Sequence, residues 1–130
     1  MADHGLKLYG NAVIVNTDYA KNNPDMVKKF LVAVGAGWRD AIKDPKSAAA
    51  ALVKRNPAAD AALEQRRLQL AIDANVLTDY VKANGMGNID KDRFALAIKQ
   101  LGETYDYKTA PDAKLYFTGA YLPDEGILLK

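Results

Sequence analysis

The sequence contains few groups that could carry out catalysis. His4 is its only histidine, and it has no cysteine. Because His4 lies before the first periodic element, we expect it to be exposed and inert. Without a histidine beside a nucleophile, or a thiol, we expect neither a catalytic triad nor a histidine-based metal centre. We therefore expect no enzymatic activity, no metal and no cofactor.

Two acidic groups have structural explanations that are simpler than chemical ones. Asp60 and Glu64 lie one helical turn apart, and such a pair acts in acid–base catalysis only if burial perturbs one carboxyl. On an exposed helix face the pair is simply solvated. The run 88–93 begins like a calcium loop but lacks the required glycine and the final glutamate. Asp90 and Asp92 instead fit the start of a helix, where acidic groups stabilise the positive end of the dipole.

Tyr9, Gly10 and Asn11 are the polar residues best placed to bind a ligand. They directly precede an apolar run, where the backbone would enter a sheet, and ligands usually bind at strand ends in α/β sheets. The simpler interpretation is that Gly10 makes a bend and Tyr9 packs. From the residue pattern alone we favour the simpler interpretation.

Composition indicates one soluble globular domain with a single core. The chain has 130 residues, is 49% hydrophobic and 26% charged, and carries a net charge of +2. Its cations are scattered rather than clustered, so we expect no nucleic-acid partner. No stretch approaches the roughly 20 apolar residues of a membrane span. The opening residues lack the apolar core of a signal peptide, so the sequence predicts no export signal in this chain.

The elements that must position these groups begin with a short strand. Ala12–Val15 is a β-branched run between Gly10-Asn11 and Asn16-Thr17, which is typical of a buried strand. A lone strand cannot satisfy its own backbone hydrogen bonds. Its partner could be the tail, a second copy of the chain, or nothing.

Helices dominate the remainder of the chain. Asparagine or aspartate before proline suits a helix N-cap followed by the first helical residue. Such pairs predict helices over Pro24–Lys43 and Pro45–Lys54 and a third that starts after Asn56-Pro57. The third ends near Asn75 or continues through Val81, and Asn84–Gly87 stops it in either case. A fourth helix follows Asp90 and ends near Gly102, and a short helical turn is expected at Asp18–Asn22.

The first long helix carries one broad apolar stripe. Its residues recur at spacings of three and four: Val27, Phe30, Leu31, Val34, Trp38, Ala41 and Ile42. Because Trp38 lies on this stripe, we expect it in the core rather than stacked on a ligand. Gly35 and Gly37 weaken a helix by roughly 1 kcal/mol each, and they permit close approach by a neighbouring element.

The tail is too apolar to be free. Leu115, Tyr116, Phe117, Tyr121 and Leu122 predict an extended segment laid along the body, with a short strand at Lys114–Phe117.

The ordered series of motifs resembles a known family. The segment from Leu8 to Pro57 has a Tyr/Gly-Asn entry, an apolar strand, a short helix ending in Asn-Pro, a "PDMVKKFLVA" helix, Gly37-Trp38 and Asp44-Pro45. This series resembles the later part of bacterial ABC-transporter solute-binding proteins, in the branch for sulfonates, taurine, nitrate and thiamine-pyrimidine precursors. "GMGNIDKDRFALAIKQL" and "LYFTGAYLP" resemble the segments that follow. The resemblance covers about residues 6–123.

The resemblance implies an α/β parent with two lobes, of the type 2 periplasmic-binding-protein kind. Residues 1–130 would form a single partial domain of it, the α-rich C-terminal part with four main helices and one or two short strands. The implied function is capture of a small polar solute outside the cytoplasmic membrane, by lobe closure, for delivery to an ABC permease. The parent would be periplasmic or extracytoplasmic. The resemblance implies that Tyr9, Gly10 and Asn11 line the ligand cleft.

Family proteins are usually more than twice as long and carry an export signal. The resemblance therefore implies a truncated protein, a proteolytic remnant or a gene fragment. The alternative function is a stand-alone, mostly helical protein-interaction module whose apolar stripe docks a partner. The unpaired strand further implies a homodimer formed by strand pairing.

Overall fold

The computed structural model describes residues 8–109, 111–123 and 126–129. His4 lies outside the described residues. Chain contacts divide the protein into two units, each built from two separate stretches of sequence. The first unit comprises Met1–Pro24 with Ile89–Ala120, and the second comprises Asp25–Asn88 with Tyr121–Lys130.

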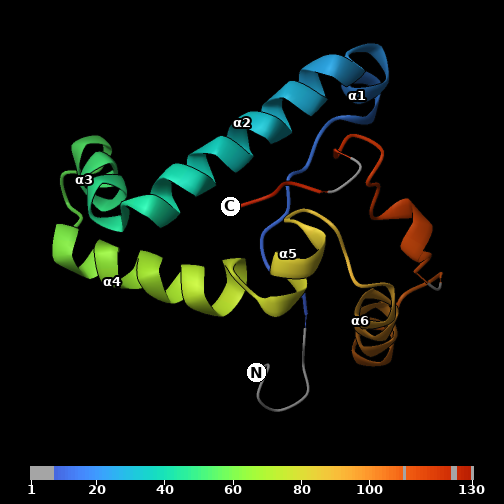
Figure 1. Cartoon of the computed structure of the whole chain (residues 1–130). Helices are drawn as coiled ribbons and strands as arrows, with labels where there is room; N and C mark the ends of the chain where they lie inside the picture. Colours follow the sequence, from blue (N-terminus) through green and yellow to red (C-terminus); the bar gives the residue numbers. More distant parts are fainter. Residues whose placement is uncertain (1–7, 110, 124–125, 130) are drawn as a thin grey trace. The chain divides into compact units, whose positions relative to one another are not determined.

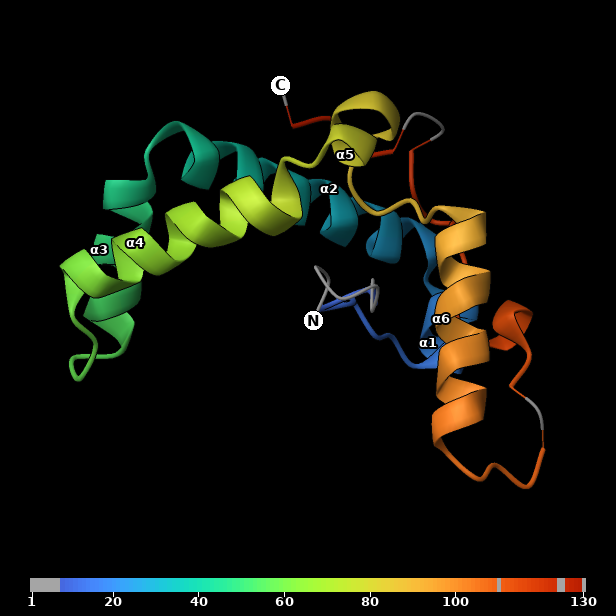
Figure 2. The same ribbon diagram turned by 90° about the horizontal axis from the view of Figure 1, so that it is seen from below.

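The first unit contains two α-helices and a single 3₁₀ turn among its described residues. These are α1 (Thr17–Asn22), α6 (Lys91–Thr104) and η3 (Ala113–Leu115). The stretch η3 packs on α6, as the orange and red segments of Figure 2 show. Phe94 of α6 joins both ends of the unit, because its ring meets Tyr9 and Phe117 in edge contacts with centroids 6.2 and 6.3 Å apart. The first unit is therefore organised around α6.

The second unit contains the longest helix of the described chain. Its elements are α2 (Pro24–Lys43), α3 (Pro45–Arg55), α4 (Ala61–Ala71), η2 (Ile72–Val76) and α5 (Asp79–Asn84). The chain reverses at α3, so that α4 runs back from it (Figure 1). The contacts of α3 are mainly with α4. The four predicted main helices are thus present as α2, α3, α4 and α6.

The predicted strand at Ala12–Val15 is wrong. Residues 8–16 have no assigned secondary structure, and the described part of the chain holds no strand. No backbone hydrogen bond joins Ala12–Val15 to another described segment. A β-branched run has the side chains for a strand, but a strand forms only when a second segment supplies the hydrogen-bonding partners.

The tail also differs from its prediction. Lys114–Phe117 is not a strand, because Ala113–Leu115 form a 3₁₀ turn capped by the Asp112 side chain. The pairing of the tail with the body occurs later, at an isolated antiparallel bridge between Met86 and Ile127. Its two N–H···O bonds measure 2.8 and 3.0 Å. The bridge is the only β-type pairing in the part of the chain that the structure describes.

Three aspartates begin helices in the way that caps require. The Asp44, Asp60 and Asp90 side chains accept hydrogen bonds from the N–H groups of Ser47, Leu63 and Arg93 at 3.0, 2.7 and 2.8 Å. Each bond satisfies one N–H that the helix itself leaves without a partner. The Asp44-Pro45 cap is therefore confirmed, and so is the start of a helix after Asp90.

The other two proline-based caps differ from the prediction. Asn23 and Asn56 are the C-caps of α1 and α3. The Asn23 side chain turns back and donates to the Tyr19 carbonyl at 3.1 Å. Pro57 lies in a turn, and α4 starts at Ala61. The third helix therefore begins later than its Asn-Pro pair predicts, because Asn56 ends α3 and the Asp60 side chain caps α4.

Of the two predicted ends of the third helix, the one near Asn75 is confirmed, because the helical structure that begins at Ala61 stops at Val76 and α5 starts separately at Asp79. After Ala71 the backbone widens into the π-helical stretch η2, in which the Leu77 N–H donates to the Ile72 carbonyl at 2.8 Å. Thr78 then caps α5, and Gly85 ends it with φ of 73°. Gly102 lies inside α6 rather than at its end.

The described chain buries few apolar side chains. Its buried hydrophobic residues are Ala20, Val27, Ala49, Ile72, Ala97 and Ile127, three of them alanine. Most of the predicted stripe on α2 is only half-buried, and Phe30 is 54% exposed. A small core of this kind provides little of the hydrophobic stabilisation on which a domain depends.

Candidate functional site

Tyr9 is held in place by the start of α6. Its hydroxyl accepts a hydrogen bond from the Asp90 N–H at 2.7 Å, and the Asp90 carbonyl lies 3.4 Å from the same oxygen. The Arg93 guanidinium carbon lies 4.3 Å from the centre of the Tyr9 ring, which is cation–π geometry. Arg93 also donates through Nη2 to the Leu8 carbonyl at 2.7 Å. These bonds fix the backbone directly before Gly10.

Gly10 and Asn11 are exposed. A Cβ added at Gly10 would meet nothing within 4 Å, and φ at this glycine is not positive. Neither residue makes a hydrogen bond to another part of the described chain. Of the three predicted ligand-binding residues, Tyr9 is therefore engaged with α6, while the polar groups of Gly10 and Asn11 face solvent.

A pocket of about 510 Å³ lies in the second unit, between α2, α3 and α4. A volume of this size is ordinary for a small-molecule site. Most of the wall is apolar: α2 provides Val34, Trp38 and Ala41, and α3 provides Ala48, Ala49 and Leu52. The space remains open because the alanine side chains of α3 are too short to fill it.

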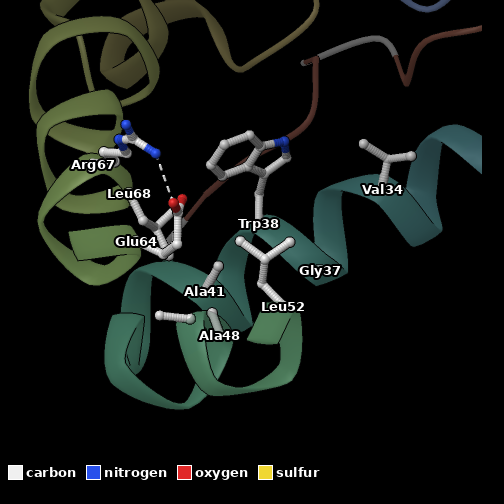
Figure 3. Close-up of a pocket in the computed structure, with 10 residues that line it drawn as sticks. Val34, Gly37, Trp38, Ala41, Ala48, Leu52, Glu64, Arg67 and Leu68 are labelled. Carbon is white, nitrogen blue, oxygen red and sulfur yellow. Dashed lines mark hydrogen bonds and ion pairs between the residues drawn. The ribbon is translucent and has the colours of Figure 1, made fainter. Parts of the chain in front are cut away.

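Trp38 forms one wall of this pocket. It is half-buried and not part of the closed core, so the expectation of a core tryptophan is met only in part. Figure 3 shows its indole ring above the Leu52 and Ala48 side chains of α3, with the six-membered ring extending toward α4. An indole ring in this position offers both apolar contact and an electron-rich face.

One ion pair supplies the charges of the pocket. Arg67 Nη1 donates to Glu64 Oε1 at 2.7 Å, one helical turn away on α4. The Glu64 side chain is 19% exposed and the Arg67 side chain 65% exposed. The carboxylate is therefore the more shielded of the two charges (Figure 3).

The predicted Asp60–Glu64 pair separates into two structural roles. Asp60 caps α4, while Glu64 is bonded to Arg67. The sequence interpretation missed the pocket because its wall comes from three helices whose packing is not local in sequence. A local signal existed: Glu64 and Arg67 stand at a spacing of three on one helix, and an alanine-rich helix precedes them.

The described residues give no indication of a metal centre or of a membrane span. No group of three or more histidine, cysteine, aspartate or glutamate side chains is positioned to hold a metal ion in the part of the chain described. Among the same residues, no helix combines the length and the apolar character that crossing a membrane requires.

Comparison with known proteins gives one similarity. A family model described as NMT1/THI5 like matches residues 1–48. The matched stretch contains Tyr9, Gly10 and Asn11, all of α2 and the start of α3. The first third of the chain is therefore similar to a family of solute-binding proteins. No curated protein and no solved structure matches the chain.

Proposed function

We propose that this chain is the closing section of the extracytoplasmic solute-binding component of an ABC importer. The observation that carries the proposal is the NMT1/THI5-like match over residues 1–48, which coincides with the ordered series from the Tyr/Gly-Asn entry to Asp44-Pro45. The parent is a two-lobed periplasmic-binding-protein-like molecule, and residues 1–130 are a single partial domain of it. Its solute is a small polar molecule of the sulfonate, taurine, nitrate or aminopyrimidine type.

Within this proposal Tyr9, Gly10 and Asn11 line the ligand cleft. The support is geometric: Tyr9 is anchored by the Asp90 N–H and by Arg93, and the two residues that follow are exposed. An anchored tyrosine beside free backbone and amide groups suits recognition of a polar solute, because positions held in advance lower the entropy lost on binding. The solute is not transformed, and lobe closure delivers it to the permease.

The DNA upstream of the first codon tests the class of protein. The proposal expects an open frame with an export signal, and permease and ATPase genes nearby. An upstream region that lacks all of these features would contradict it.

Calorimetry tests the site. The chain alone should not bind taurine, nitrate or an aminopyrimidine at micromolar concentration, because the proposal assigns the other half of the cleft to residues outside this chain. Micromolar binding by the monomeric chain would contradict the proposal that this chain holds only half of the ligand cleft.

A substitution tests Asn11 in the complete two-lobed parent protein. There, Asn11→Ala should weaken solute binding about tenfold, as expected for loss of a hydrogen bond at the site. Asn23→Ala, which changes another exposed asparagine, should leave the affinity unchanged.

A protein-interaction module is the second candidate function. The observation that favours it is the exposure of large apolar side chains on α2, including Met26 and Phe30 at 55% and 54%. Exposed apolar side chains one helical turn apart fit a helix of another protein. Three results together would favour this function over solute capture. The chain would be a monodisperse monomer in light scattering, it would unfold cooperatively, and the complete two-lobed parent protein would not bind the solutes.

A further inference from the structure

We propose that the pocket between α2, α3 and α4 binds small organic cations in which a primary ammonium group is joined to an apolar body. The site lies in the second unit and includes none of Tyr9, Gly10 and Asn11. The inference therefore does not depend on the transport function proposed above.

The apolar body has a suitable place in the pocket. The wall formed by Ala41, Ala48, Ala49 and Leu52 offers only carbon atoms from its side chains. The pocket volume of about 510 Å³ leaves room for a ring or a short branched chain. Burial of such a group removes apolar surface from water, which favours binding.

The charged groups favour a cation over an anion. Glu64 is the more shielded member of the ion pair, at 19% exposure against 65% for Arg67. Only its Oε1 accepts a hydrogen bond among the described residues, so Oε2 retains its capacity to accept from a ligand ammonium. The Arg67 guanidinium is already bonded and is largely in solvent, so it attracts an anion only weakly.

Trp38 adds a second attraction for a cation. Its indole ring extends toward α4, the helix that carries Glu64 (Figure 3). Tryptophan presents the best aromatic face for an ammonium group, and the attraction increases when the ion is partly desolvated. An ammonium group bonded to Glu64 can therefore also contact the indole ring while its apolar body lies against α3.

The experiment uses the full chain and the indole N–H signal of Trp38 in an NMR titration. Trp38 is the only tryptophan in the sequence, so this signal reports directly on the pocket. The probes are cyclohexylmethylammonium, cyclohexylmethanol and cyclohexanecarboxylate, which share a ring and differ in charge. The cation should shift the signal saturably and bind about tenfold more tightly than the alcohol, the expected value of one charge-assisted hydrogen bond. Equal binding of the alcohol, or tighter binding of the carboxylate, would overturn the proposal.

Variants separate the two charges of the pocket. Glu64→Gln should weaken cation binding about tenfold. Arg67→Gln should strengthen it roughly threefold, because it removes the internal cation that competes for Glu64. Weaker cation binding in Arg67→Gln would overturn the proposal even if Glu64→Gln failed to fold.

Two further variants complete the design. Ala48→Leu should fill the pocket, so that the cation no longer shifts the Trp38 indole N–H signal. Helix content measured by circular dichroism shows whether this variant is folded. Glu103→Gln is the matched control, because Glu103 belongs to an exposed pair with Lys99 on α6, outside the pocket. It should leave the affinity unchanged, and a loss equal to that of Glu64→Gln would show that the effect is not local.

Discussion

Tyr9 joins two stretches of the first unit that are 81 residues apart in sequence. Its hydroxyl accepts the Asp90 N–H at 2.7 Å, and Asp90 in turn caps α6 through the Arg93 N–H at 2.8 Å. Asp90 thus fixes both the start of α6 and the position of the Tyr9 ring. These two bonds therefore also position the proposed ligand-binding residues.

Removal of the Tyr9 hydroxyl tests the anchor. Tyr9→Phe should destabilise the chain by about 0.5–1.5 kcal/mol, because the half-buried Asp90 N–H loses its acceptor while the ring contacts remain. Urea unfolding followed by circular dichroism measures the change. Tyr19→Phe is the matched control, since Tyr19 is 48% exposed, and it should have no effect. If both variants are as stable as the unsubstituted chain, the Tyr9 hydroxyl does not hold the segment before Gly10 in place.

At the scale of elements, the two glycines of α2 have different roles. A Cβ on Gly35 would collide with Cγ2 of Ile127, a buried residue of the tail, whereas a Cβ on Gly37 would meet nothing within 4 Å. The close approach expected from the sequence is confirmed at Gly35 and is absent at Gly37. The tail is also held to α2 by Arg39 Nη1, which donates to the Leu128 carbonyl at 2.9 Å.

Alanine substitutions distinguish these roles. Gly37→Ala should stabilise the chain by up to about 1 kcal/mol through helix propensity alone. Gly35→Ala gains the same propensity but overpacks Ile127, which costs about 1–3 kcal/mol, so it should give no gain or a net loss. Thermal unfolding of the pair measures the difference. A stabilising Gly35→Ala would mean that the tail is not seated on α2.

Substitution of the helix caps tests which Asn/Asp-Pro pair begins a helix. Asp44→Ala should cost about 1 kcal/mol, since its carboxylate accepts the Ser47 N–H. Asn56→Ala should cost less than about 0.5 kcal/mol, because Asn56 takes part in the described hydrogen bonds only through its backbone. Helix content and urea midpoints provide the measurement. A larger loss in Asn56→Ala than in Asp44→Ala would contradict the observed caps.

These elements show which features could be predicted from sequence. The bounds of α2 and the Asp44 cap were predictable, because helical periodicity and caps depend on residues three or four positions apart. The strand at Ala12–Val15 was not, since its formation depends on a partner segment that local pattern does not reveal. The pocket was not predictable either, because Trp38 and Glu64 approach each other only after α3 has reversed the chain.

At the scale of the whole molecule, exposed apolar surface is the main feature. Val13, Ile14 and Val15 are 52%, 93% and 37% exposed, and their backbone groups lack partners among the described residues. An extended β-branched segment of this kind is a ready template for pairing with another chain. We propose that two copies pair through it in solution.

A charge placed on this segment tests the pairing. Ile14→Lys should lower self-association in light scattering at high concentration. It should change the stability of the monomer by less than about 0.5 kcal/mol, because the side chain is exposed. Leu70→Lys, at another exposed apolar position on α4, should leave association unchanged. If the unsubstituted 130-residue chain is strictly monomeric, or if both variants change association equally, pairing through this segment is ruled out.

The seating of the tail on α2 has a consequence for synthesis on the ribosome. Arg39 and Leu128 are 89 residues apart in sequence, and the Ile127 side chain lies directly against Gly35. At ordinary translation speeds, α2 therefore waits about 5–20 s between its own emergence and the arrival of the segment that closes over it. During that interval the part of α2 around Gly35 is open to chaperones, to other nascent chains and to proteases.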